Sequence, residues 1–233
     1  MAGEARVADL DPFDLLDTEA ERVARFFESG PDWSLPTRCE GWNVHDLLAH
    51  VDGVEVYHTA CLDDSLAALF EEAGKKGASD VDSFNGMFVE DGRSKSTDEL
   101  LASWRTRNAD VRKRLRERGR DGSLSSSVGP YPVGLMAFHI ASEYATHADD
   151  MGVEIPAAER AARTAWRAKV SEFAVEETDK PVTFEARNGS HVVRVGNKEA
   201  TLPDADFVEA VTARLPKDYA IDPEVRDGLR ALA

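Results

Sequence analysis

The chain has 233 residues and a formal net charge of −16, because 44 acidic side chains outnumber 28 basic ones. Such an acidic surface repels phosphate backbones and anionic lipid head groups, which argues against nucleic-acid binding and membrane-surface binding. Hydrophobic residues make up 42 % of the sequence, enough for a sizeable core. No apolar run approaches the roughly 18 residues of a membrane span.

The N-terminus lacks the basic and apolar regions of a signal peptide. The two cysteines, Cys39 and Cys61, are too few for a disulfide scaffold in a chain of this length. These features predict a cytoplasmic protein with reduced thiols. The expected assembly is a monomer or a small homo-oligomer, and the sequence does not decide between them.

Apolar residues at helical spacing predict a first helix over residues 11–28, which ends at the breaker SGPDW. A second helix is expected after Asn43, with Asp46 in the capping-box position, and it is expected to run to about Phe70. Residues 71–95 are polar and glycine-rich, which indicates a connection ordered in part by apolar side chains, namely Phe84, Met87 and Phe88.

Ser96 and Glu99 form a second capping-box pattern, which predicts a third helix. A fourth helix is expected from Val133 to about Met151, closed by Gly152, and a fifth after Pro156.

The pattern changes near residue 180. The stretch PVTFEARNGSHVVRVG alternates apolar and polar residues around Asn188-Gly189, a strong signal for a β-hairpin. Two short helices are expected after it, in DADFVEAVTARL and PEVRDGLRAL. The predicted fold is therefore mainly α. It consists of a four-helix bundle domain over residues 10–178 and a small α/β C-terminal domain over residues 181–233.

The fourth helix carries an unusual set of polar residues among apolar ones. Glu143 and His147 are four residues apart, so they lie one turn apart on nearly the same face. A buried carboxylate needs a partner, and a metal ion would serve both side chains. A zinc site normally needs a third protein ligand. His139 lies roughly 12 Å from His147 along the helix axis, too far for one ion, whereas His50 lies on the apolar side of the second helix.

The hypothesis is a metal site formed by His50, Glu143 and His147, with open coordination positions. The alternative is a buried, hydrogen-bonded cluster without a metal. The other histidines considered, His45, His58 and His139, are interpreted as surface or supporting residues. Cys39 is interpreted as a small packing residue near the start of the second helix, because no base stands beside it.

Two stretches of the sequence resemble the mycothiol-dependent maleylpyruvate isomerase family, whose members contain a DinB-like metal-binding bundle. LPTRCEGWNVHDLLAHVDGVE carries the Thr-x-Cys-x-Gly-Trp pattern of the family ahead of a helix with a metal-binding His, here Thr37, Cys39, Gly41, Trp42 and His50. The second stretch is the Glu-x-x-x-His pair of the last bundle helix, here Glu143 and His147 with Asp149 and Asp150 behind them. The resemblance covers residues 10–178.

The resemblance implies a DinB-like fold and a divalent metal, Zn²⁺ foremost, held by His50, Glu143 and His147. It also implies an enzyme that uses a low-molecular-weight thiol such as mycothiol as cosubstrate, for S-transfer to a small electrophilic molecule or for its cis–trans isomerisation. Two alternatives stay open: a metal-dependent hydrolase on the same bundle, and a non-catalytic metal- or ligand-binding module. The sequence identifies neither a catalytic residue nor a thiol-binding residue, and it does not separate Zn²⁺ from Ni²⁺, Fe²⁺ or Mn²⁺.

Overall fold

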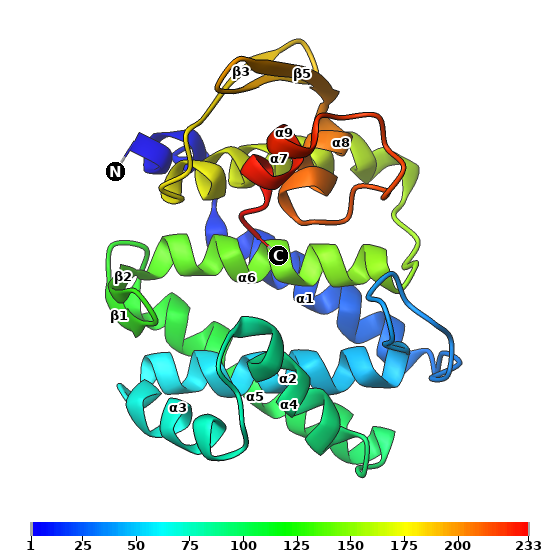
Figure 1. The fold of residues 1–233 in the computed structure, drawn as a ribbon. Helices are drawn as coiled ribbons and strands as arrows, with labels where there is room; N and C mark the ends of the chain where they lie inside the picture. The colour runs from blue at the N-terminus through cyan, green and yellow to red at the C-terminus, as the bar shows by residue number, and fades with distance from the viewer. Residues whose placement is uncertain (1, 233) are drawn as a thin grey trace. The chain divides into compact units, whose positions relative to one another are not determined.

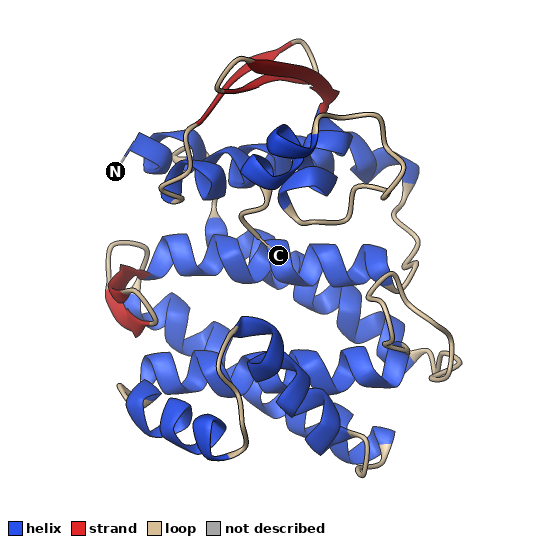
Figure 2. Cartoon of the chain, in the orientation of Figure 1, coloured by secondary structure: helices blue, strands red, loops and turns tan. Residues whose placement is uncertain are grey.

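The computed structural model describes residues 2–232 (Figure 1). The chain is mainly helical, with a small strand-containing region near its C-terminal end, which confirms the predicted fold class (Figure 2). Contacts divide it into two compact units, one of residues Pro12–Val153 and one of residues 2–11 together with residues 154–232. None of the described helices combines the length and the hydropathy that a membrane crossing requires.

The first unit is a helical bundle. Helix α1 (Pro12–Glu28) packs against α6 (Val133–Asp150), and α2 (Val44–Leu62) packs against α5 (Thr97–Arg118). Large side chains fill the space between these helices: the Trp104 ring lies edge-on to Phe27, with centroids 5.5 Å apart, and its Nε1–H donates to Tyr144 Oη over 2.9 Å. Burial of such aromatic side chains is the main force that holds a bundle together.

The predicted caps fix where two of these helices begin. The Asn43 side chain accepts the backbone N–H of Asp46, whose side chain accepts the N–H of Asn43 in return. Ser96 and Glu99 form the same reciprocal pair at the start of α5. Each box satisfies backbone donors that a helix N-terminus otherwise leaves without intrahelical partners.

The region after α2 differs from the expectation. The predicted helix to Phe70 ends at Leu62, because Asp64 has φ +54°, a left-handed conformation that interrupts an α-helix. A separate helix α3 (Leu66–Lys75) follows. The expected polar connection contains a further helix α4 (Val81–Gly92), capped by Asp80 and Ser83. A hairpin of β1 (Ser123–Ser126) and β2 (Gly129–Pro132), also unexpected, precedes α6.

Helix α4 packs closely on α2 at a glycine. A Cβ atom at Gly53 would clash with the ring of Phe88, so only glycine permits this approach. This tertiary contact orders a segment whose own composition is polar and glycine-rich.

The second unit combines helices with a small sheet. Strands β3 (Val182–Arg187), β4 (Ser190–Val195) and β5 (Lys198–Pro203) form an antiparallel sheet in that order. Asn188 and Gly189 both have positive φ, as the predicted hairpin turn requires. Strand β5 was not expected. The two expected short helices are α8 (Asp204–Val211) and α9 (Pro223–Leu229).

The boundary between the units lies after Val153, whereas the sequence analysis placed it near residue 180. The difference concerns helix α7 (Ala157–Glu177), which packs against the 3₁₀ helix η1 (Ala2–Val7) and against α8. The side chain of Arg6 on η1 forms an ion pair with Glu176 on α7 at 2.9 Å. Packing against α8 joins the fifth helix to the C-terminal part of the chain, and the Arg6–Glu176 pair adds the N-terminal segment to the same unit.

Candidate metal centre

The Thr-x-Cys-x-Gly-Trp stretch is a tight turn immediately before α2. The N–H of Thr37 donates to the carbonyl of Trp42 over 3.0 Å, and the N–H of Trp42 donates to the carbonyl of Cys39 over 3.0 Å. The hydroxyl of Thr37 also donates to the Trp42 carbonyl, over 2.9 Å. Gly41 has φ +83°, a conformation that favours glycine. The motif is thus a structural device that sets the positions of Cys39 and Trp42 at the entry to the bundle.

The structure brings together the three residues predicted to bind a metal. Nε2 of His50 lies 3.0 Å from Oε1 of Glu143, and Nε2 of His147 lies 3.1 Å from the same oxygen. The two imidazole rings meet edge to face, with centroids 4.8 Å apart. Trp42 packs on His50 with ring centroids 5.1 Å apart, which limits the orientations open to that imidazole.

The cluster is buried on one side and accessible on the other. Both histidine side chains are buried, whereas the side chain of Glu143 is 35 % exposed. Glu143 is therefore the one of the three residues through which the cluster meets solvent.

Electrostatics couple the charge states of these residues. Burial favours the neutral form of Glu143, but the adjacent His147 and His50 more than offset this effect, and the pKa of the carboxyl lies well below its ordinary value. Burial likewise disfavours a charged His147, but Glu143 together with contacts to Asp150 and Cys39 holds its pKa well above the ordinary value. Without a metal, both shifts favour a carboxylate beside a protonated imidazole.

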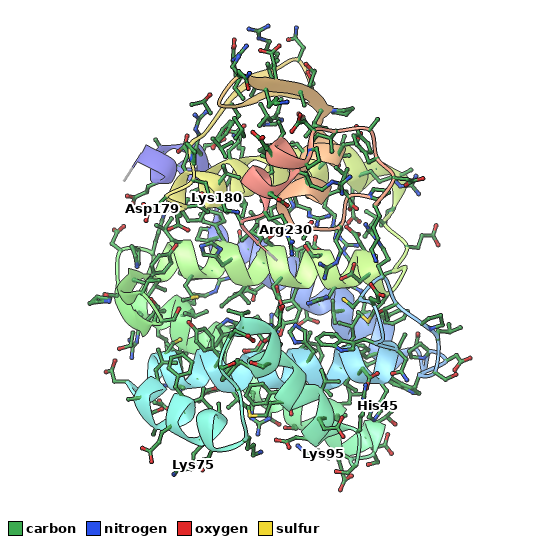
Figure 3. The ribbon with its side chains drawn as sticks, in the orientation of Figure 1. His45, Lys75, Lys95, Asp179, Lys180 and Arg230 are labelled. Atoms are coloured by element: carbon green, nitrogen blue, oxygen red, sulfur yellow. The ribbon has the colours of Figure 1, made fainter. Side chains whose placement is uncertain are left out.

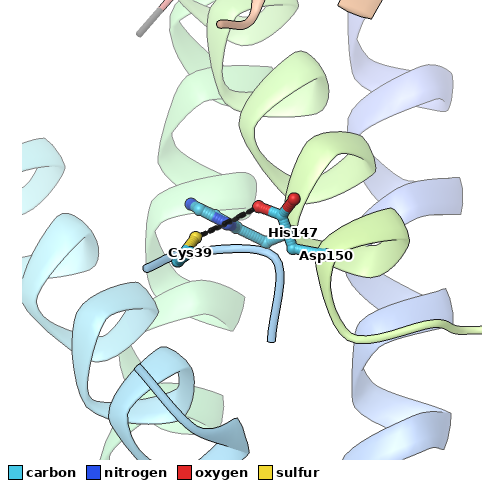
Figure 4. Close-up of side chains that lie close together, drawn as sticks. All are labelled: Cys39, His147 and Asp150. Atoms are coloured by element: carbon cyan, nitrogen blue, oxygen red, sulfur yellow. Dashed lines mark hydrogen bonds and ion pairs between the residues drawn. The ribbon is translucent and has the colours of Figure 1, made fainter. Parts of the chain in front are cut away.

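Two further side chains contact His147 on its other ring nitrogen (Figure 4). Oδ2 of Asp150 lies 3.0 Å from Nδ1 of His147 and accepts the Cys39 thiol over 3.3 Å. The backbone N–H of Arg38 donates to the Asp150 carbonyl over 3.1 Å and so ties the turn to the end of α6. A carboxylate on Nδ1 directs Nε2 of a histidine toward a metal, an arrangement common behind metal-binding histidines.

The chemistry of the donor set fits a divalent metal. The donor atoms of His50, Glu143 and His147 all lie within 4.8 Å of one another. Two imidazole nitrogens and one carboxylate oxygen form the His₂Glu set of catalytic zinc sites, in which bonds of about 2.0–2.2 Å bring neighbouring ligand atoms to about 3 Å or slightly more. The contacts of 3.0 and 3.1 Å match this spacing. The same distances are also those of hydrogen bonds in a buried cluster without a metal. The metal content of the purified protein therefore separates the two interpretations.

The bundle unit contains three other histidines, which lie outside this set of donors. His45 Nε2 lies 3.1 Å from the carbonyl oxygen of Lys95, at the start of α2 (Figure 3). His139 Nε2 lies 3.0 Å from the hydroxyl of Tyr131. His58 was interpreted as a surface or supporting residue, but it is buried and its Nδ1 lies 3.5 Å from Oε2 of Glu55.

Sequence reasoning missed a buried polar network next to the cluster of His50, Glu143 and His147. Tyr144, which follows Glu143 on α6, donates its hydroxyl to Glu55 and accepts the side-chain N–H groups of Trp104 and Asn108, each over 2.9 Å. Asn108 also donates to Glu55 over 2.7 Å. Burial alone raises the pKa of Glu55, but His58, Tyr144 and Asn108 offset this and lower it below the ordinary value. The network joins α2, α5 and α6, the helices that position the cluster.

Comparison with known proteins places this geometry in context. A family model described as the mycothiol maleylpyruvate isomerase N-terminal domain matches residues 16–152, more than half of the chain. Two crystal structures of the mycothiol-dependent maleylpyruvate isomerase, one of them of a mutant, share the fold with a TM-score of 0.57. Each is 12 % identical and covers 92 % of this chain and 94 % of its own. None of the curated proteins compared with the chain matches it.

Proposed function

The chain belongs to the mycothiol maleylpyruvate isomerase family, and from this premise we propose that it is a metal-dependent enzyme that uses a low-molecular-weight thiol of the mycothiol type. The proposed reaction is S-transfer to a small electrophilic molecule or its cis–trans isomerisation. The observation that carries the proposal is the convergence of His50, Glu143 and His147, with an accessible side at Glu143. The proposed partners are the thiol and the electrophile.

The residues have distinct roles in this proposal. His50, Glu143 and His147 hold the ion, for which Zn²⁺ is the first candidate. A divalent metal at these donors would lower the pKa of a coordinated thiol and so supply a thiolate near neutral pH. Asp150 accepts the Nδ1–H of His147 and keeps Nε2 directed at the other donors. Trp42 packs against the His50 ring and helps to hold its orientation.

A second candidate function is metal-dependent hydrolysis. The observation in its favour is the donor set itself, because two histidines and one glutamate also hold zinc in hydrolases that use the open position for water. A protein with the same metal site but no reaction would be a binding module, and the experiment below separates all three.

The proposal places the enzyme in the cytoplasm. Neither Cys39 nor Cys61 is part of a disulfide, as is usual in reducing compartments, where a thiol cosubstrate also remains reduced.

Titration of mycothiol into metal-loaded and metal-free protein tests the proposal, by calorimetry in two buffers of different ionisation enthalpy. We expect binding to the metal-loaded protein alone, with release of a proton near pH 7, because a free thiol with a pKa of about 8.5 is mostly protonated there. Glu143→Gln should weaken binding strongly, since a neutral amide is a poor ligand, while His139→Ala serves as the control. Absence of thiol affinity with hydrolysis of ester or amide substrates would favour the hydrolase. Absence of both, with metal bound, would favour the binding module.

A further inference from the structure

The bundle unit contains a cavity whose lining does not include the donor residues described above. It has a volume of 510 Å³ and is lined by α2, α3, α4 and the turn of the β1–β2 hairpin. Ligand pockets in proteins typically have volumes of about 300–1,000 Å³ and mostly apolar walls with a few polar groups. The size of this cavity therefore suits a small organic molecule.

Aromatic side chains dominate one wall of the cavity. Tyr57 of α2, Phe70 of α3 and Phe84 of α4 contact one another, with ring centroids 5.7–6.4 Å apart. Tilted and edge-to-face contacts at this distance are favourable between aromatic rings. A planar aromatic guest can extend the same pattern of contacts.

The mouth of the cavity is unusually apolar. Among the described residues, four large hydrophobic side chains are strongly exposed, and three of them are here: Phe70 at 41 %, Val81 at 64 %, and Val128 at 80 % beside the lining residue Ser127. Exposed apolar side chains that gather at one place mark a binding surface, because their hydration is unfavourable. Isolated ones need no such explanation.

The charge of the residues that line the cavity determines which ligands it can bind. Asp80 lines the cavity, whereas Lys and Arg are absent from its lining in the described part of the chain. The carboxylate of Asp80 accepts the N–H of Ser83 over 2.8 Å and is held by the cap of α4. The whole chain adds a net charge of −16. An anion would lose its hydration here without gaining a cationic partner.

We propose that this cavity is a binding site for a small aromatic molecule that carries no negative charge. The polar groups available to orient it are the side chains of Asn85 and Ser79 and the hydroxyl of Tyr57. His50, Val54 and Tyr57 lie at positions i, i+4 and i+7 of α2 and so share one helix face. The cavity begins about 6 Å along the helix axis from His50. Binding requires no metal, so it can be tested separately from the proposed thiol chemistry.

A pair of fluorescent probes tests this proposal on the full chain. N-phenyl-1-naphthylamine is an uncharged aromatic amine, and 1-anilinonaphthalene-8-sulfonate has the same aromatic body with an added sulfonate. We expect the uncharged probe to bind with a stoichiometry of one, and the sulfonate to bind at least about tenfold more weakly because of its buried charge. Equal affinities for the two probes would overturn the proposal.

Substitutions locate the bound probe. Ala78→Trp fills the cavity from the loop between α3 and α4 and should reduce affinity for the uncharged probe at least about tenfold. Ala68→Trp, an exposed position of α3 outside the lining, is the matched control and should leave affinity unchanged. Phe84→Leu removes an aromatic ring but keeps an apolar side chain, and it should also reduce affinity for the uncharged probe. It serves as the second test if Ala78→Trp does not fold. Full affinity in a folded Ala78→Trp protein, or in Phe84→Leu, would contradict the proposed location.

Discussion

Asp150 contacts His147 on the ring nitrogen opposite the candidate metal ligands. Its Oδ2 lies 3.0 Å from Nδ1, while Nε2 of the same ring lies 3.1 Å from Glu143 Oε1. One histidine thus links a buried carboxylate to a partly exposed one. The orientation of His147, and with it the shape of the proposed metal site, depends on a residue that is not itself among the three proposed ligands.

The first prediction concerns this carboxylate. Asp150→Asn should lower metal affinity by about 10–100-fold, because the amide holds the imidazole tautomer less firmly and withdraws a negative charge. Competition with a chromophoric chelator measures the effect. Asp149→Asn, one residue earlier on α6, is the matched control and should bind metal like the unchanged protein. An Asp150→Asn protein with unaltered affinity would show that Asp150 does not act through His147.

The second prediction concerns stability. His50→Ala should abolish stoichiometric metal binding and remove the stabilisation that the ion provides, which is about 2.7 kcal/mol when free metal is at 100 times its dissociation constant. For a unit of this size, that amounts to several degrees of melting temperature, at roughly 2–4 °C per kcal/mol. His45→Ala removes another histidine of the same helix and is the control. This variant should keep the metal-dependent rise in melting temperature. A melting temperature insensitive to metal in the unchanged protein would favour the hydrogen-bonded cluster.

The third prediction concerns pH. The raised pKa of His147 in the metal-free protein means that the metal must displace a proton, so apparent metal affinity should rise with pH. The rise should continue above pH 6.5, the ordinary value for histidine, until the raised pKa is passed. Chelator competition across this range measures it. Affinity that is constant above pH 6.5 would show that His147 is already neutral without metal.

The raised pKa of His147 has the opposite effect on the stability of the metal-free protein, which should fall as pH rises. A group whose pKa is raised on folding stabilises the native state below its unfolded pKa, and this stabilisation is lost as pH rises through the raised value. The melting temperature of metal-free protein should therefore fall above pH 6.5. Asp150→Asn should reduce that fall, because Asp150 contributes to the shift.

The fourth prediction concerns the buried network beside the site. Tyr144→Phe leaves Trp104 without its hydrogen-bond acceptor and deprives Glu55 of a donor, which should destabilise the fold by about 1–3 kcal/mol. Tyr57→Phe is the control, because its hydroxyl accepts a long contact of 3.4 Å from Ser127 and lies beside the Cys61 thiol, outside the Glu55 network. Denaturant unfolding measures both. An equal loss in the two variants would contradict a special role for the network.

The loss of stability caused by Tyr144→Phe should also depend on pH. The pKa of Glu55 is lowered in the fold, so its stabilisation is present above the ordinary value of 4.5 and is lost as pH falls through the lowered one. The difference between Tyr144→Phe and the unchanged protein should therefore shrink in acid. A difference that grows as pH falls would mean that Glu55 is protonated in the native state.

The helices of the bundle were predictable because their signals are local. Asn43 and Ser96 cap α2 and α5 through residues three positions later, and Asn188-Gly189 sets the β3–β4 turn within its own backbone. Helix α4 was not predictable in this way, because the seat of Phe88 depends on a close approach to Gly53 on another helix. The position of α7 likewise depends on long-range packing against η1 and α8.

The same distinction applies to the site. The spacing of Glu143 and His147 and the apolar surroundings of His50 were sufficient to propose three converging side chains. The role of Cys39 depends on a turn held by backbone hydrogen bonds, such as that from Arg38 to Asp150, which no residue pattern reveals. The spacing of His147 and Asp150, three residues apart on one helix, was the available signal for the contact between these two residues.

Anomalous diffraction from crystals grown with zinc tests the central claim, a metal held by His50, Glu143 and His147. Data collected on both sides of the zinc absorption edge locate the ion without reference to any assumed site. The account predicts one strong peak at bond distances of about 2.0–2.2 Å from Nε2 of His50, Nε2 of His147 and a carboxylate oxygen of Glu143. Absence of a peak there, or a peak bound instead by Cys39 and Asp150 on the far side of His147, would contradict it.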